Sequence, residues 1–237
     1  MTASGLADRV VLVTGAAGNL GAAVVARLIA SGSSVVAANR SADKLAVATA
    51  GLGERHLARG GVDLTDPAAC RRLVDEAIDR FGRLDGLVST VGTFAMASIE
   101  AADPAHWELL YRANVLTTLN ICRAVVPVMR SAGRGGIVTI GAAGAARAGK
   151  GTAAYAAAKS AVLRLTESLA DELKGHGVRA NCVLPSIIDT LQNRADMPKA
   201  DTGRWVTPAQ LAEVIAFLLS DAASGVTGTG VPVTAKG

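Results

Sequence analysis

The sequence predicts an α/β fold built around a parallel β-sheet. Short apolar runs rich in β-branched residues alternate with longer helical patterns, beginning with Val10–Thr14, Leu20–Ala30 and Ser34–Asn39. This alternation is typical of repeated βαβ units, in which each helix connects two parallel strands. Half of the 237 residues are hydrophobic but only 3% are aromatic, so we expect a core of small aliphatic side chains.

The apolar runs correspond to seven strands, with helices between them. The predicted strands are Val10–Thr14, Ser34–Asn39, Gly61–Asp63, Leu84–Thr90, Gly136–Ile140, Val178–Leu184 and Val231–Thr234. The predicted helices are Leu20–Ala30, Pro67–Phe81, Pro104–Arg130, Thr152–Lys174 and Thr207–Ser220. Pro67, Pro104 and Pro208 each stand where a first helical turn would begin, and there a missing N–H costs no hydrogen bond. No linker or repeat divides the chain, so we expect a single domain over residues 1–237.

Charge and hydrophobicity exclude several classes of protein. The formal net charge is +4, but Lys and Arg are scattered among acidic residues, which argues against nucleic-acid binding. No apolar run approaches the roughly 20 residues that a bilayer crossing requires, and the first residues lack an apolar export segment. We therefore expect a protein that binds neither nucleic acid nor membrane.

The cysteines and histidines are isolated from one another. They are Cys70, Cys122, Cys182, His56, His106 and His176. An odd number of widely spaced cysteines favours buried, reduced thiols in a cytoplasmic protein over disulfides, and none of these residues has metal-ligand spacing. We expect no metal site.

The first predicted strand leads into a glycine-rich turn and a helix. Gly15, Gly18 and Gly21 lie in the segment G-A-A-G-N-L-G that follows Thr14. Such a turn lets the backbone approach a pyrophosphate, whose charge the helix amino terminus stabilises. The alternative is that the glycines only close a tight strand-to-helix corner. The order of strand, turn and helix favours a dinucleotide site.

Asn39 ends the second predicted strand, where an acidic residue would bind the adenosine ribose of NAD, and Arg40 follows it. A neutral side chain beside a cation favours the 2′-phosphate of NADP, although NAD stays an alternative and Arg40 could be a solvated loop residue. Asp63, near the next strand end, could accept a hydrogen bond from adenine or cap the helix that begins at Pro67.

Tyr155 and Lys159 lie four residues apart in the alanine-rich stretch Y-A-A-A-K, so a helix would place both on one face. An ammonium beside a phenol favours the phenolate and would lower the pKa of the tyrosine, which suits acid/base catalysis. The alternative is a surface tyrosine near a solvated lysine.

These residues, with further motifs in register, resemble the short-chain dehydrogenase/reductase family across nearly the whole chain. The matching elements are T-G-A-A-G-N-L-G from Thr14, Asp63, V-G at 91 and 92, Asn114, Y-A-A-A-K at 155, N-C-V-L-P-S-I-I-D-T at 181 to 190, and a terminal T-G-T-G-V-P-V. The resemblance implies a single-domain Rossmann-like fold, with a seven-stranded parallel sheet covered by helices on both faces. It also implies a nicotinamide cofactor, hydride transfer, and a homodimer or homotetramer paired through the long helices.

The resemblance assigns a role to each matching residue. Tyr155 would protonate the substrate, Lys159 would also hold the nicotinamide ribose, and Asn114 would support a water chain to solvent. Thr190 would contact the nicotinamide carboxamide. The expected cofactor-binding residues are Gly15, Gly18, Asn19, Leu20, Gly21, Asn39, Arg40, Asp63, Leu64, Val91, Gly92, Tyr155, Lys159, Pro185, Ile188 and Thr190.

The chain also departs from the family pattern. Asn19 stands at the usual middle glycine, Ser186 replaces the glycine that follows Pro185, and Ala142 stands where a serine is expected. That serine would help to hold the reacting carbonyl. Loss of one donor of this kind typically costs on the order of 10²–10³ in rate.

Two explanations fit Ala142. The substrate could supply its own activation, as a quinonoid ring does on reduction, or the chain could be a catalytically impaired NAD(P)-binding regulatory protein. The dihydropteridine reductase-like branch of the family carries a small residue at this position, and residues 189–205 resemble that branch. We predict an NAD(P)-dependent oxidoreductase, with NADPH favoured, that acts on a small carbonyl or conjugated substrate.

Overall fold

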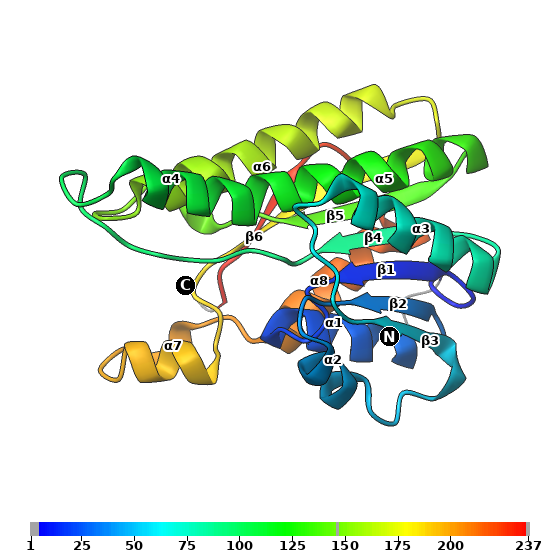
Figure 1. Ribbon diagram of the computed structural model, residues 1–237, viewed down its shortest axis with the longest axis horizontal. Helices are drawn as coiled ribbons and strands as arrows, with labels where there is room; N and C mark the ends of the chain where they lie inside the picture. Colours follow the sequence, from blue (N-terminus) through cyan, green and yellow to red (C-terminus); the bar gives the residue numbers. More distant parts are fainter. Residues whose placement is uncertain (1–4, 146, 236–237) are drawn as a thin grey trace.

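The computed structural model describes residues 5–145 and 147–235, and within these ranges it contains one parallel sheet of seven strands. The strands are β1 (Val10–Thr14), β2 (Ser34–Ala38), β3 (His56–Arg59), β4 (Gly86–Ser89), β5 (Gly135–Ile140), β6 (Val178–Pro185) and β7 (Gly230–Val233). They pair in the order β3-β2-β1-β4-β5-β6-β7, so the strand order reverses between β1 and β4 (Figure 1). The predicted fold class is confirmed.

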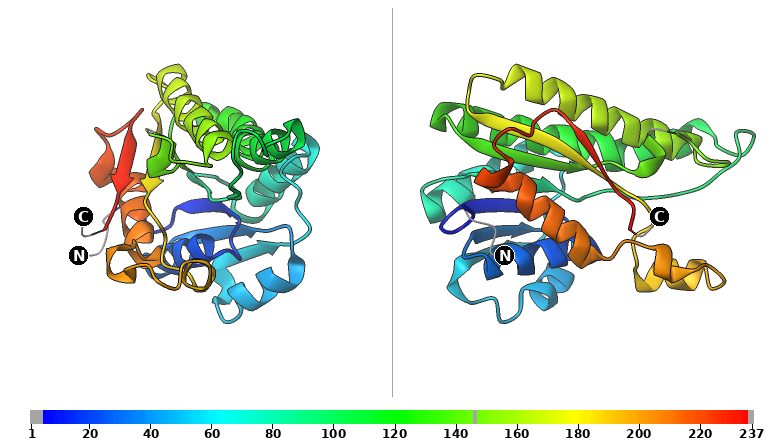
Figure 2. Two further views of the ribbon diagram at one scale, coloured as in Figure 1. Left: turned by 90° about the vertical axis from the view of Figure 1, so that its left-hand side faces the viewer. Right: turned by 180° about the vertical axis from the view of Figure 1, so that it is seen from behind.

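Helices cover both faces of this sheet (Figures 1 and 2). The helices are α1 (Asn19–Ala30), α2 (Ala42–Thr49), α3 (Pro67–Phe81), α4 (Pro104–Tyr111), α5 (Thr117–Ala132), α6 (Ala153–Glu172), α7 (Leu191–Asp196) and α8 (Pro208–Leu219). α1 and α8 pack together on one face, while α3, α5 and α6 cover the other. In the described ranges, none of the helices has the length and hydrophobicity that a bilayer crossing requires.

The central strand β1 is buried on both faces, as a parallel sheet between two helical layers requires. Val11 and Val13 lie in the core beneath α1 and α8. Val10 and Leu12 alternate with them and lie in the core beneath α3 and α5. The continuous apolar run in the sequence therefore reflects two different cores.

The predicted strand at Gly61–Asp63 was wrong. β3 lies at His56–Arg59, where it pairs with Val35–Ala38 of β2. A Cβ on Gly60 would come within 2.5 Å of the Ala42 backbone and side chain, and Gly61 has a positive φ of 73°. The two glycines therefore form the turn after the strand. The sequence reading also missed α2, which begins at Ala42 after the Ser41 cap.

The long predicted helix from Pro104 is interrupted. A π-helical turn at Arg112–Leu116 separates α4 from α5, and Asn114 lies in this turn. Such turns widen a helix locally and often occur at functional sites. The three predicted first-turn prolines are confirmed, because α3, α4 and α8 begin at Pro67, Pro104 and Pro208.

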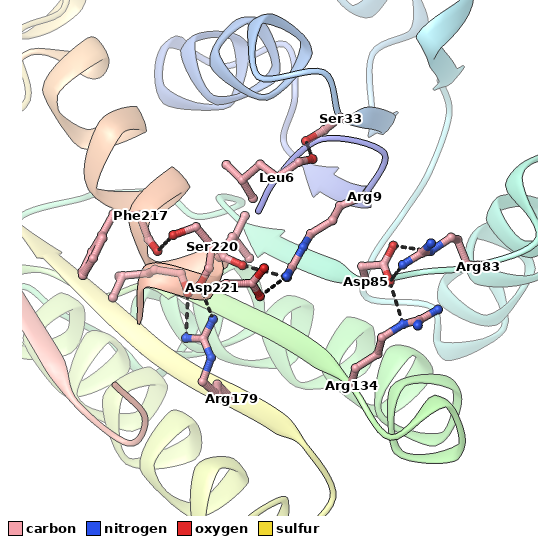
Figure 3. A network of polar contacts seen from close by, with 12 residues as sticks. Leu6, Arg9, Ser33, Arg83, Asp85, Arg134, Arg179, Phe217, Ser220 and Asp221 are labelled. Carbon is pink, nitrogen blue, oxygen red and sulfur yellow. Dashed lines mark hydrogen bonds and ion pairs between the residues drawn. The ribbon is translucent and has the colours of Figure 1, made fainter. Parts of the chain in front are cut away.

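A network of charged side chains ties together the amino ends of the strands (Figure 3). Asp85, which is 3% exposed, accepts hydrogen bonds from the Val10 backbone at 2.9 Å and from Arg83 and Arg134 at 2.7 and 3.2 Å. Nearby, Arg179 donates to three carbonyls at the carboxyl end of α8 and just beyond it. These contacts join the amino ends of the central strands to one another and to the end of α8.

We expect Asp85→Asn to lower the free energy of unfolding by about 1–3 kcal/mol, because it removes charge-assisted bonds from a buried carboxylate. Urea unfolding followed by circular dichroism measures this change. The matched control is Asp8→Asn, since Asp8 is highly exposed and its oxygen lies 3.6 Å from Arg55. That control should change stability by about 0.5 kcal/mol or less, and equal effects of the two substitutions would contradict the role of Asp85.

Candidate active site

A cavity of about 830 Å³ lies at the carboxyl ends of the strands, beside the point where the strand order reverses. Ligands of open α/β sheets bind at this place, and the volume suits a small-molecule site. Most of the predicted cofactor-binding residues line it. They are Gly15, Gly18, Asn19, Leu20, Gly21, Gly92, Tyr155, Lys159, Pro185, Ile188 and Thr190.

The glycine turn forms one end of the cavity. A Cβ on Gly21 would lie 2.2 Å from the carbonyl oxygen of Gly15, and a Cβ on Gly15 would lie 2.7 Å from the Thr90 hydroxyl. Gly18 is the N-cap of α1 and offers no side chain to the free N–H groups of the first turn. These N–H groups therefore face the cavity at the positive end of the helix, an arrangement that fits a pyrophosphate.

Tyr155 and Lys159 both reach the cavity from the first two turns of α6. The Lys159 ammonium nitrogen donates to the Ile140 carbonyl oxygen at 2.9 Å and lies 5.9 Å from the centre of the Tyr155 ring. The alternative of a solvated lysine is wrong, because Lys159 is only 5% exposed. The predicted pair thus shares one site.

Burial sets the protonation of this pair. It raises the pKa of Tyr155 to about 12 and lowers the pKa of Lys159 to about 8. The expectation that Lys159 lowers the tyrosine pKa is therefore wrong for this arrangement, since desolvation dominates and the ammonium points to Ile140. Tyr155 therefore keeps its proton across the neutral range.

Asn114 is fully buried behind the cavity and does not line it. Its amide donates to the carbonyls of Thr93 and Leu110 at 3.0 and 2.9 Å, and its oxygen accepts from the Thr93 backbone at 3.2 Å. A Cβ on Gly92 would meet this oxygen at 2.6 Å and the Lys159 nitrogen at 3.0 Å. Asn114 therefore positions the loop after β4, and Gly92 permits the close approach.

The outer part of the cavity is apolar, which the sequence analysis did not anticipate. Phe94 and Met96 come from the loop after β4, and Ile187 and Met197 come from the segments around α7. The Phe94 and Tyr155 rings meet edge to face, with centroids 4.8 Å apart. Phe94 follows Gly92 of the V-G motif by only two residues. This short separation was the feature of the sequence that could have placed Phe94 beside the cavity.

Other predicted residues lie outside this cavity. They are Asn39, Arg40, Asp63, Leu64, Val91 and Asn114. The Asn39 amide donates to the Ser41 carbonyl at 3.1 Å, and Arg40 has no salt bridge among the described residues. The Leu64 side chain is buried in the core beneath α3, so it offers a ligand only its backbone.

The predicted capping role of Asp63 is wrong. Asp63 accepts hydrogen bonds from the backbone and hydroxyl of Thr65, both at 2.8 Å, and these bonds lower the pKa of its carboxyl. Asp66 caps α3 instead, through the N–H groups of its first turn. The adenine contact of Asp63 stays a prediction.

Two residues that depart from the family pattern line the same cavity. Ala142 and Ser186 both line it, on the segments that follow β5 and β6. Trp205 is 6% exposed and borders a second, adjoining cavity of about 470 Å³, which Ser186 also lines. This tryptophan is therefore a buried residue of the core.

Comparison with known proteins identifies the family. A family model described as short chain dehydrogenase matches residues 9–200. The chain is 33% identical to D-threitol dehydrogenase of Mycolicibacterium smegmatis, over 96% of this chain and 92% of that protein. It is 36% identical to cis-4-hydroxycyclohexanecarboxylate dehydrogenase of Sinomonas cyclohexanicum, over 94% of this chain and 93% of that one.

A solved structure agrees with these sequences. The short-chain type dehydrogenase/reductase from Mycobacterium ulcerans superposes with a TM-score of 0.91 at 32% identity, covering 96% of this chain and 88% of that one. The chain belongs to the short-chain dehydrogenase family and is an NAD(P)-dependent oxidoreductase with a Rossmann-like fold.

Proposed function

We propose that the protein reduces a small carbonyl or conjugated, quinonoid substrate with NADPH and that Tyr155 donates the proton. The observation that carries this proposal is one cavity that contains the open amino end of α1, Tyr155 and Lys159. A bound nicotinamide cofactor supplies the hydride. The chain's own groups orient the substrate and provide the proton.

Each polar group has a distinct task in this proposal. Tyr155, with a pKa raised to about 12, keeps the proton that the substrate oxygen takes. Lys159 holds the nicotinamide ribose with its ammonium group. Asn114 holds the loop after β4 in place and supports the water chain by which Tyr155 regains its proton.

The apolar outer cavity favours a planar, weakly polar substrate. Phe94, Met96, Ile187 and Met197 supply aromatic, sulfur and aliphatic contacts, which suit a conjugated ring. The relatives are named for oxidation of a threitol and of a hydroxycyclohexanecarboxylate, both hydroxyl compounds. Interconversion of a hydroxyl and a carbonyl group is consistent with these names and with Tyr155. The pterin-like branch stays a prediction.

NADPH is favoured because a cation stands at the end of β2. Arg40 is unpaired in salt bridges within the described ranges, and its neighbour Asn39 carries no negative charge. A 2′-phosphate would meet attraction and no repulsion there. The remaining predicted contacts, from Asp63, Leu64 and Val91, would serve the adenine end.

We also propose a cytoplasmic homodimer or homotetramer. Trp107 and Tyr111 lie four residues apart on one face of α4 and are 37% and 48% exposed, so they supply an apolar surface for pairing through the long helices. A monomer mass by light scattering would contradict this assembly.

A cofactor-binding regulatory protein is the rival function, and Ala142 motivates it. Calorimetry with NADPH and NADH, followed by a panel of ketones, quinones and quinonoid dihydropterins, separates the two functions. Tight cofactor binding without cofactor oxidation by any acceptor would favour the regulatory protein. Retention of both Tyr155 and Lys159 in the cavity supports the enzyme.

Tyr155→Phe should lower kcat/KM by about 10²–10⁴, the usual contribution of a positioned proton donor, and should change cofactor affinity much less than this. The decrease in NADPH absorbance with an active acceptor gives the rate, and calorimetry gives the affinity. Tyr111→Phe is the matched control, because Tyr111 lies on α4 outside the cavity. An undiminished rate in Tyr155→Phe would remove Tyr155 from the mechanism.

The rate of reduction should decrease as the pH rises through about 8. Lys159, with its pKa lowered to about 8, is an ammonium below that pH and neutral above it, so its charged contact with the nicotinamide ribose is lost on the alkaline side. A profile of log kcat/KM from pH 6 to 10 measures the effect. A profile that stays flat to pH 10 would show that the ammonium charge is not required.

Arg40→Ala should weaken NADPH binding by about tenfold, because it removes one charge-assisted contact to the 2′-phosphate, and should leave NADH binding unchanged. Calorimetric titration of each cofactor measures both affinities. Arg164→Ala is the control, since Arg164 is an exposed residue of α6 paired with Glu167. Equal losses for NADPH and NADH would contradict a phosphate-binding role.

A further inference from the structure

The Ser186 hydroxyl is a buried donor with no partner. Its oxygen has no hydrogen bond to any described residue, although it is shielded from solvent in the walls of both cavities. Buried hydroxyls in folded proteins nearly always have a hydrogen-bond partner, so an orphan in a cavity wall points to a missing ligand. No described residue satisfies the Ser186 hydroxyl, so a ligand in the cavity is its natural hydrogen-bond partner.

The Ser186 backbone is hydrogen-bonded to β7, just beyond the end of β6. Its backbone N–H donates to the Val233 carbonyl at 3.0 Å, one residue beyond the pairing of Pro185 with Val233. Cys182 and Leu184, four and two residues earlier, pack in the core cluster formed with α6. Ser186 lies just beyond the end of β6 and lines the cavity together with Tyr155 and Lys159 of α6.

Ala142 and Ser186 follow the carboxyl ends of the neighbouring strands β5 and β6, and their positions along the strand direction are nearly the same. Ile140 of β5 is paired with Val183 of β6, and the Gly141 N–H donates to the Val183 carbonyl at 2.8 Å. Ala142 follows Ile140 by two residues, and Ser186 follows Val183 by three. The wall from 141 to 144 consists only of glycine and alanine, so it offers no side-chain donor.

Several other polar side chains of the cavity are already bonded within the fold. The Lys159 ammonium donates to Ile140, the Thr90 hydroxyl donates to Thr14 at 2.7 Å, and the Asn193 amide donates to Ile188 at 2.8 Å. Ser186 differs from them because its proton is uncommitted. A substrate oxygen that enters the cavity would satisfy it.

We propose that Ser186 donates a second hydrogen bond to the oxygen of the reacting carbonyl, beside Tyr155, and so replaces from β6 the hydroxyl that Ala142 lacks on β5. The proposal rests on the reductase function proposed above. In the reduction, the carbonyl carbon gains the hydride supplied by the cofactor and the oxygen takes the Tyr155 proton. Ser186 keeps its own proton and stabilises the charge that develops on the oxygen.

A two-site comparison tests the replacement, with 9,10-phenanthrenequinone as the acceptor. Ser186→Ala should lower kcat/KM by about 10- to 100-fold, toward the low end of the effect of losing one such donor. Ala142→Ser combined with Ser186→Ala should recover most of that loss, whereas Ala142→Ser alone should change little. Ser168→Ala is the matched control, since its hydroxyl bonds to Glu172 on the exposed side of α6.

A binding measurement separates this proposal from the proposed function. Titration of the quinone into the NADP⁺ complex, in which no reduction occurs, should show weaker quinone binding for Ser186→Ala and unchanged NADP⁺ affinity. An unchanged kcat/KM and quinone affinity would overturn the proposal, as would a loss of NADP⁺ affinity equal to the loss in kcat/KM. If the wild type binds the quinone through Ser186 but oxidises no NADPH, the reductase function fails and the contact stands.

Discussion

The parallel pairing of β1 with both β2 and β4 is the constraint on which the rest of the structure depends. Because β1 pairs with β2 on one side and β4 on the other, the loops that follow these strands leave the sheet in opposite directions and open the cavity. The glycine turn after β1 then closes so tightly that Gly21 cannot carry a side chain. Backbone geometry, ahead of any side chain, therefore creates the anion-binding end of the site.

The catalytic pair depends on a second close approach. Gly92 leaves room for the Asn114 oxygen and the Lys159 nitrogen, and Asn114 in turn holds Thr93 from both of its backbone groups. Lys159 is thereby confined to a buried position, where desolvation lowers its pKa to about 8. One π-helical turn, one glycine and one asparagine thus determine the environment of the lysine.

Much of the fold and most of the residues that line the cavity could be predicted from the sequence, because both depend on local patterns. Apolar runs locate strands, and glycines and prolines locate turns and helix starts. The sequence could not show that burial outweighs charge attraction at Tyr155, since desolvation depends on residues distant in the chain. It also misplaced β3, because its side chains are only partly buried and the glycines at 60 and 61 resembled a strand boundary.

The loss of a serine at position 142 looks different once the sheet is known. A donor to a developing oxyanion must lie within hydrogen-bond distance of that oxygen, whichever strand it comes from. A parallel sheet places the carboxyl ends of several neighbouring strands side by side around one cavity. Glycine and alanine follow β5, while the residue after β6 is a serine whose hydroxyl has no partner among the described residues. A residue that departs from the family pattern on one strand is therefore accompanied by a compensating departure on its neighbour. Considered alone, Ala142 indicates an impaired enzyme, and the Ser186 hydroxyl has no evident role. Considered together, the two residues indicate that the second hydrogen-bond donor to the substrate oxygen follows β6 and no longer follows β5.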